Sequence, residues 1–99
     1  MFDLTAFQRD LLYVIAGQKK PHGLAIKKEM QKSYTEEINH GRLYPNLDTL
    51  VEKGLVEKGK KDKRTNSYGL TERGQREIDA RGEWEKQYIK ALTEDSETA

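Results

Sequence analysis

The sequence predicts a mainly α-helical domain that carries one small β-hairpin. Apolar residues recur at intervals of three and four along three stretches in the first half of the chain, as they do on the buried face of a helix. Two short strand-like stretches, 55–60 and 66–70, then flank the polar turn "KDKRT", and a last helical stretch follows them. The expected order of elements is therefore helix, helix, helix, hairpin and helix.

Capping and breaker residues bound the first two expected helices. Thr5 is suited to cap the first helix, and the segment "GQKKPHG" ends it because glycine and proline favour turns. The second helix is expected from about Leu24 to Tyr34. Its apolar stripe carries Ile26 and Met30, and its lysines lie on the other side.

The third helix is expected at about 40–53, after the N-cap candidate Asn39. Leu43, Leu47, Leu50 and Val51 form its buried stripe, and Gly54 ends it. Pro45 lies near its front, where a proline is tolerated only if its missing N–H has little or no partner to lose. We therefore expect the helix to begin around His40 to Arg42, with a slight distortion at Pro45.

The last helix is expected to start at Thr71 and to run to about Leu92, although Gly74 and Gly82 weaken the pattern locally. The acidic segment "TEDSETA" follows. The sequence thus predicts a domain at 1–75, a C-terminal helix at 76–93 and an acidic disordered tail at 94–99.

Composition narrows the classes of function. The chain has 99 residues, of which 34% are hydrophobic and 35% charged, so one domain with a small core is expected, and a partner subunit would add buried area. The lack of cysteine excludes disulfides and thiolate chemistry. No apolar run approaches the roughly 20 residues of a membrane span, and the N-terminus does not resemble a signal peptide. A cytoplasmic protein without a membrane partner is expected.

Catalysis finds little support in the residues. Neither histidine, His22 or His40, belongs to a recognisable catalytic motif, and the glycines of "GQKKPHG" lack the spacing of a phosphate-binding loop. We expect no enzyme, no catalytic or metal site and no cofactor.

Double-stranded DNA is a better-supported partner. Three short helices followed by a basic hairpin is the element order of a winged helix-turn-helix, in which the helix before the hairpin enters the major groove. The hairpin at 58–65 would be the wing, which meets the phosphate backbone or the minor groove. The net charge is only +1, but lysines gather in two zones, at 19–32 and at 58–64.

Arg42, Asn46 and Thr49 form a stripe about 100° around the third helix from its core face. Side chains of these types can contact guanine, adenine and the thymine methyl group, so they are the candidate base-reading residues. Asp48 and Glu52 are expected on another side, away from the DNA. An ordinary polar face of a packed helix is the alternative. The candidates for the DNA backbone are Asn39, His40, Tyr44, Lys53, Lys27, Lys28, Lys60, Lys61, Lys63 and Arg64.

The stretches "GRLYPNLDTLVEKGLVEK" and "KRTNSYGLTERG" resemble the DNA-binding domain of the PadR family of transcriptional regulators. The likeness covers about residues 5–75 and is greatest to archaeal members. "HGLAIKKEM" resembles the family's second helix, with His22 in place of the usual tyrosine. The chain departs from halophilic members in being rich in lysine rather than strongly acidic.

The resemblance implies a homodimer that pairs through its C-terminal helix and binds near-palindromic operators. Large apolar groups on a charged helix agree with such a contact. The candidate interface residues are Leu4, Phe7, Ile78, Trp84, Tyr88, Ala91 and Leu92. Some family members bind flat ligands near a tryptophan of this helix, so a small-molecule effector near Trp84 stays open. A winged-helix module that binds proteins and not DNA also stays open.

Overall fold

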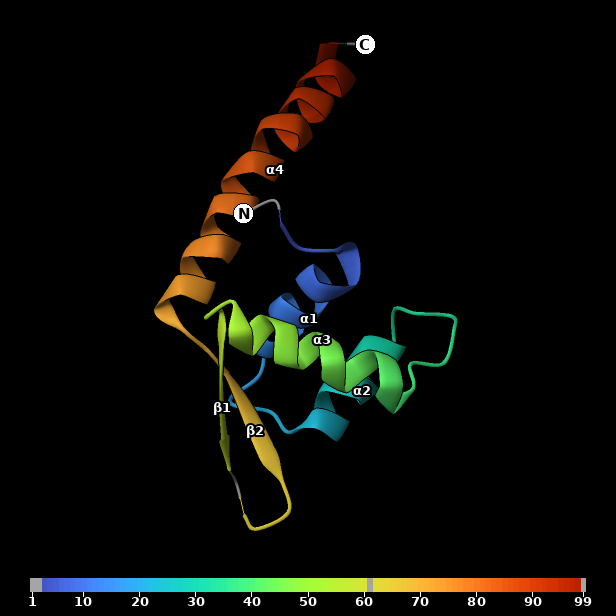
Figure 1. The fold of residues 1–99 in the computed structure, drawn as a ribbon. Helices are drawn as coiled ribbons and strands as arrows, with labels where there is room; N and C mark the ends of the chain where they lie inside the picture. The colour runs from blue at the N-terminus through green and yellow to red at the C-terminus, as the bar shows by residue number, and fades with distance from the viewer. Residues whose placement is uncertain (1–2, 61, 99) are drawn as a thin grey trace.

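The structure, a computed structural model, describes residues 3–60 and 62–98. Its elements follow the predicted order of three helices, a hairpin and a last helix (Figure 1). They are α1 (Ala6–Ala16), α2 (Gly23–Gln31), α3 (His40–Glu52), β1 (Val56–Lys60), β2 (Asn66–Leu70) and α4 (Glu72–Thr98). The prediction of a winged helix-turn-helix is confirmed.

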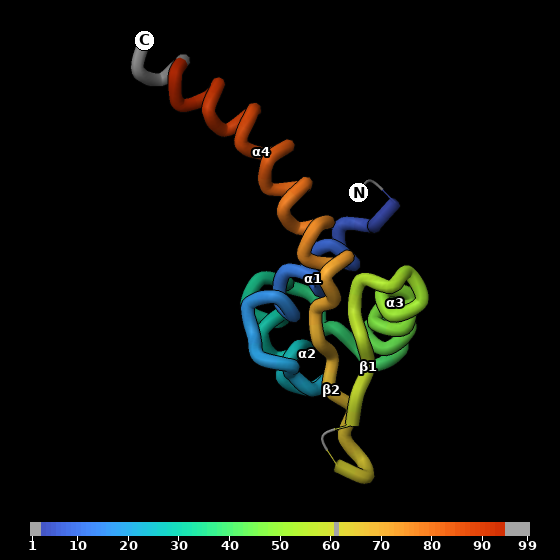
Figure 2. Tube along the Cα trace, turned by 90° about the vertical axis from the view of Figure 1, so that its left-hand side faces the viewer, coloured from blue at the N-terminus to red at the C-terminus, as the bar shows by residue number. Residues whose placement is uncertain are grey.

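The three short helices and the base of the hairpin enclose one hydrophobic core. The hairpin projects from one end of this body and α4 leaves from the other, which gives the chain extents of 57 × 30 × 23 Å (Figures 1 and 2). The core combines side chains from every element before α4. Its fully buried members include Leu11, Leu12, Ile15, Ile26, Met30, Ile38, Leu43, Leu47, Leu50, Val56 and Tyr68.

Two of the helices begin at the caps that the sequence predicts. The Thr5 hydroxyl accepts a hydrogen bond from the Gln8 N–H at 3.1 Å, and the Gln8 side chain accepts one from the Thr5 N–H at 3.2 Å. This reciprocal pair is a capping box. The Asn39 side chain caps α3 by accepting from the Arg42 N–H at 2.9 Å. In contrast, α2, whose N-cap residue is His22, has no side-chain cap among the described residues.

Helix α3 continues through Pro45, because the proline follows closely on the first turn and removes only one N–H. The helix begins at His40, within the predicted interval. It ends at Glu52 with Lys53 as its C-cap. Gly54 follows, and its φ of 74° lies in the left-handed region that glycine adopts without strain. The Gly54 N–H donates to the Val51 carbonyl at 2.9 Å.

The hairpin is antiparallel, with Val56 opposite Leu70 and Lys60 opposite Asn66. Thr71 joins it to α4, since its hydroxyl donates to the Gly54 carbonyl at 2.7 Å and accepts from the Gly74 N–H at 3.0 Å.

Helix α4 extends to Thr98, beyond the predicted end near Leu92, so it includes most of the segment for which a disordered tail is expected. Ile78 packs against the core, whereas every described side chain from Lys86 to Glu94 is exposed. Within the described ranges, no helix is both long and apolar enough to cross a membrane.

Candidate nucleic-acid interface

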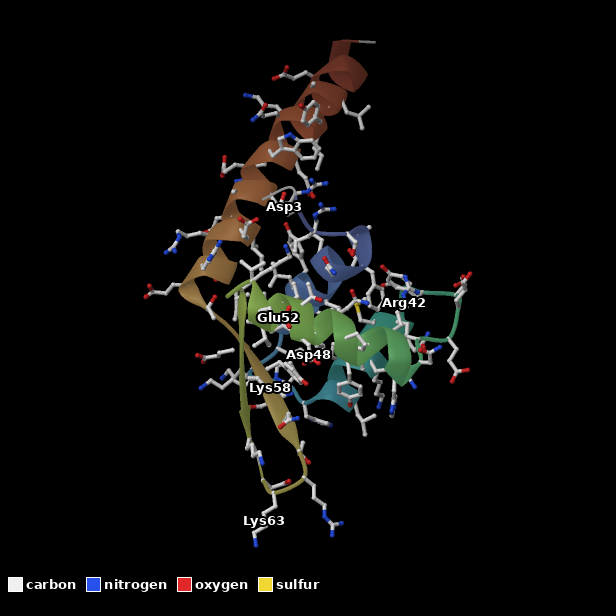
Figure 3. All side chains as sticks on the ribbon, viewed as in Figure 1. Asp3, Arg42, Asp48, Glu52, Lys58 and Lys63 are labelled. Atoms are coloured by element: carbon white, nitrogen blue, oxygen red, sulfur yellow. The ribbon has the colours of Figure 1, made fainter. Side chains whose placement is uncertain are left out.

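The exposed face of α3 lies opposite its core stripe. Because Leu43, Leu47 and Leu50 point inward, the positions half a turn away point outward. These outward positions are Gly41, Pro45, Asp48 and Glu52, and all four are exposed. Figure 3 shows Asp48 and Glu52 along the side of α3 that faces the viewer. If α3 enters the major groove, this face is the part of the helix that points toward the bases.

Arg42, the first candidate for base reading, stacks on aromatic rings of its own chain. Its guanidinium lies 4.0 Å from the centre of the Phe7 ring and 5.7 Å from that of Tyr34. The Tyr34 hydroxyl donates to Asp10 at 2.5 Å, and this bond is the largest cause of the raised pKa of Tyr34. Arg42 is therefore held at the leading end of α3 with its charge over a ring face.

Asn46, the second candidate, is hydrogen-bonded at both ends of its carboxamide. Its oxygen accepts from the Gln8 side chain at 3.0 Å, and its nitrogen donates to the Arg42 carbonyl at 2.7 Å. The Thr49 hydroxyl donates to the Pro45 carbonyl at 3.0 Å. In the free protein, the predicted base-reading stripe is thus a half-buried flank of α3 that faces α1.

Lys53, at the far end of the same flank, faces the N-terminal segment. It lines a cavity of about 260 Å³ together with acidic residues and Arg73. Those acidic residues are Asp3, Glu52 and Glu77. Lys53 is thus surrounded by acidic residues, unlike the wing cations that are candidates for the same DNA backbone.

Asp48 lies on another side of α3 from Arg42, Asn46 and Thr49, opposite the core stripe. Its carboxylate is 3.7 Å from the Lys58 ammonium on β1, between α3 and the wing (Figure 3). The expectation that this side lies away from the DNA stays a prediction. Lys58 is an adjoining cation that is not among the candidate residues.

The tip of the wing is basic and is shaped by one carboxylate. Asp62 accepts from the Arg64 N–H at 2.8 Å and from the Thr65 N–H at 2.9 Å. The first of these bonds is the largest cause of the lowered pKa of Asp62. Lys60, Lys63 and Arg64 are exposed, and Lys63 lies at the extreme end of the hairpin (Figure 3). Lys61, also a candidate, lies outside the described residues.

The remaining backbone candidates lie on α2 and at the start of α3. The His40 and Tyr44 rings meet edge to face with centroids 5.4 Å apart. Asn39 uses its side-chain oxygen for the cap of α3. On α2, Lys27 is half-buried and Lys28 is exposed.

The candidate interface residues divide into two groups. Phe7 is only 6% exposed, because it belongs to the core of its own chain and Arg42 covers its ring. Little of its side chain is therefore left for the contact between subunits that the sequence predicts. Leu4 and Ile78 pack at the edge of the same core.

The other group lies along α4. The Trp84 and Tyr88 rings are 5.0 Å apart, and the Arg81 guanidinium lies 4.2 Å from the Trp84 ring. Tyr88, Ala91 and Leu92 are exposed, as is Ile89, which is not among the candidate interface residues. Its place three residues before Leu92 is the helical spacing that could have identified it.

Among the described residues, no group of three or more histidine, aspartate or glutamate side chains is placed to hold a metal ion. The carboxylates of Asp48, Glu52 and Asp62 share this surface with cations, amides and hydroxyl groups. The cations, amides and hydroxyl groups suit the recognition of an anionic polymer.

Comparisons with known proteins agree with this geometry. Residues 11–80 match the model of the transcriptional regulator PadR-like family. RosR of Halobacterium salinarum, in crystals grown from NaBr, is 45% identical with a TM-score of 0.81, covering 99% of this chain and 97% of that chain. A complex structure of RosR is 46% identical with a TM-score of 0.81, covering 98% and 95%.

A more distant structure supports the fold alone. F93 from STIV, a winged-helix DNA-binding protein, is 21% identical with a TM-score of 0.72, covering 87% of this chain and 94% of that chain. A comparison with curated proteins gave no match.

Proposed function

We propose a function from one premise: this chain belongs to the PadR-like family of transcriptional regulators. We infer that it acts as a homodimer that binds double-stranded DNA at a near-palindromic operator. The family is one of regulators and not of enzymes.

The wing is the observation that carries the proposal. Its cations Lys60, Lys63 and Arg64 are exposed at the end of a hairpin that projects beyond the helical body (Figure 1). Because these side chains do not pack in the core, they do not stabilise the fold through burial. Placed against a phosphate backbone or in the minor groove, it neutralises phosphates and releases counterions.

The sequence would be read by α3 in the major groove. The leading part of its outward face, at Gly41 and Pro45, has little side-chain bulk and admits a close approach of the helix to the bases, whereas Asp48 and Glu52 occupy the rest of that face. Arg42 and Thr49 border this face and would reach base edges from its side. Asn46 would read a base only if its bond with Gln8 opens, so in the free state it positions α3 against α1.

The dimer would be formed through α4. Tyr88 and Ile89 are 58% and 59% exposed on a helix whose end lies beyond the body of the chain. A helix with large apolar groups in water is stabilised when a second helix covers them. A second copy would also place two α3 helices for successive major grooves.

Fluorescence anisotropy with genomic DNA fragments at two salt concentrations tests the proposal. We expect binding that weakens steeply as salt rises, because each phosphate contact releases counterions. Absence of salt-dependent binding would instead favour the module that binds proteins.

A further inference from the structure

We propose that the N-terminus of α2, the Tyr68 hydroxyl and the Arg64 guanidinium together form a seat for one backbone phosphate of the bound DNA. The inference rests on the proposed DNA binding and adds a site to it. Neither Tyr68 nor the first turn of α2 was among the expected contacts. Three features of the molecule support this seat: a cavity, a helix end without a side-chain cap and a buried hydroxyl without a partner among the described residues.

The cavity lies where α2, α3 and the wing meet. Its volume is about 300 Å³, and it is lined by His22, Gly23 and Leu24 of α2 and by Tyr44 of α3. The wing completes the lining with Arg64, Thr65, Asn66 and Tyr68. No carboxylate lines it among the described residues, so the charge in its wall comes from Arg64. A site of this composition suits an anion of the size of a phosphate group.

The first turn of α2 supplies N–H donors. The opening N–H groups of any helix lack partners within the helix, and the helix dipole gives them partial positive charge. The side chains of Thr5 and Asn39 satisfy such groups on α1 and α3, whereas the His22 side chain makes no cap bond on α2. An uncapped helix N-terminus of this kind is suited to bind a phosphate.

Tyr68 is the second, independent observation. It is 1% exposed, and its hydroxyl has no hydrogen-bond partner within the described part of the chain. A buried hydroxyl without a partner costs folding free energy. Burial is the largest cause of its raised pKa, so the group stays protonated and can donate. A phosphate oxygen in the cavity would provide the missing acceptor.

The three elements around the cavity are held in place by the backbone. The Tyr68 N–H donates to the Pro21 carbonyl at 2.9 Å, and His22 forms a bridge with Ser67, so β2 is joined to the start of α2. On the other side, a Cβ added to Gly23 would lie only 2.5 Å from the Tyr44 hydroxyl oxygen. Glycine at this position therefore allows Tyr44 to lie against the first turn of α2. Asp48, which acts electrostatically on Tyr68, is paired with Lys58.

The substitution Tyr68→Phe tests the seat because it removes only the hydroxyl. We expect the affinity for specific and nonspecific DNA to fall alike, by about tenfold, as for the loss of a hydrogen bond to a charged group. The salt slope should stay constant, since no charge is lost. The unfolding temperature should be equal or higher, because the hydroxyl has no partner to lose. Tyr13→Phe, on α1, is the matched control and should leave DNA affinity unchanged.

A scan with methylphosphonate-substituted DNA locates the phosphate. One position in each half-site should weaken the wild-type protein but have a smaller effect on Tyr68→Phe, because the two changes remove the same contact. Amide NMR signals of Leu24 and Ala25 should shift when this DNA binds. If inorganic phosphate shifts these signals and DNA does not, the cavity takes a free anion and the seat for DNA is rejected.

The outcomes separate this inference from the proposed function. A wild-type protein without salt-dependent DNA binding overturns both. Normal binding by the wild type, with Tyr68→Phe bound within twofold as tightly, overturns the phosphate seat alone. Unchanged affinity of Tyr68→Phe would also mean that its hydroxyl stays buried when DNA is bound.

Discussion

Arg42 makes a contact within the free protein and is also proposed to make one with DNA. Its guanidinium lies over Phe7, and it borders the outward face of α3. To reach a guanine it must leave the ring, at a cost on the order of 1 kcal/mol for a cation–π contact. The aromatic surface thus orders the side chain before binding and sets the energy that a base contact must exceed.

Replacing Arg42 tests this role. Arg42→Ala should weaken binding to a selected operator by about 1–3 kcal/mol and relax preference at one base position. Arg42→Lys keeps the charge but loses the bidentate geometry, so it should relax the preference while retaining most nonspecific affinity. The measurement is anisotropy on the operator and on single-base variants. Unchanged operator affinity of Arg42→Ala would remove Arg42 from base reading.

Replacing Asp48 should strengthen DNA binding, whereas replacing Arg42 should weaken it. Its carboxylate lies beside Lys58 at the surface proposed for DNA, so it repels phosphates and partly neutralises a cation. Asp48→Asn removes one negative charge, so it should raise the affinity for all DNA sequences by roughly several-fold. The gain should shrink as salt rises, because salt screens the charge.

Glu52→Gln is the matched control for Asp48→Asn, because Glu52 is exposed on the same face, one turn further along α3 and beside Lys53. Its effect on affinity should be smaller. A selective loss of operator affinity in Asp48→Asn would mean that Asp48 accepts a hydrogen bond from a base.

The helices and strands could be predicted from the sequence, but the way they pack could not. The apolar spacing along each helix, the caps at Thr5 and Asn39 and the turn residues near Gly54 are local features, and they predict all six elements in order. The rotation of α3 about its axis depends on contacts with distant residues, such as the bond between Gln8 and Asn46. The spacing predicts that Arg42 and Asn46 lie on a flank about 100° from the core face, but only the fold shows that this flank packs against α1.

The length of α4 also exceeded the prediction. Glutamate is a good helix former, and the pairs Lys90 with Glu94 and Lys86 with Glu83 support the helix from its surface. Each such pair contributes a few tenths of a kcal/mol. The phosphate seat was missed for a different reason, because its residues come from elements that only the fold brings together.

The contribution of the wing should be visible in how DNA affinity depends on salt. Arg64→Ala should weaken all sequences alike and reduce the slope of log affinity against log salt by about 1, because one phosphate contact is lost. Lys63→Ala should do the same if the extreme tip also touches the backbone. Lys32→Ala, on an exposed lysine that pairs with Glu29, is the control and should keep the slope. A constant slope in Arg64→Ala would place the wing away from DNA.

The whole molecule is a compact body with one long helix that extends away from it. The exposed apolar groups of α4 lie on the extended part, where its own chain covers little of them. Figure 2 shows α4 leaving the body at the end opposite the hairpin. A pairing of two copies through α4 would therefore leave both wings and both α3 helices accessible to DNA.

Charges introduced on α4 test this arrangement. Ile89→Glu and Tyr88→Glu should shift the protein toward monomer in sedimentation velocity, since an unpaired carboxylate would be buried between subunits. Gln87→Glu adds the same charge at a neighbouring position and should leave the dimer intact if it lies outside the contact. A dimer that persists in both Ile89→Glu and Tyr88→Glu would exclude this face.

Selection of bound sequences from a random DNA pool tests directly whether the chain recognises DNA as a symmetric dimer. We expect one enriched motif with two inverted half-sites, centred about 10 bp apart, because two α3 helices of a dimer enter successive major grooves. An enriched motif without inverted symmetry, or a pool in which no sequence is enriched, would contradict it.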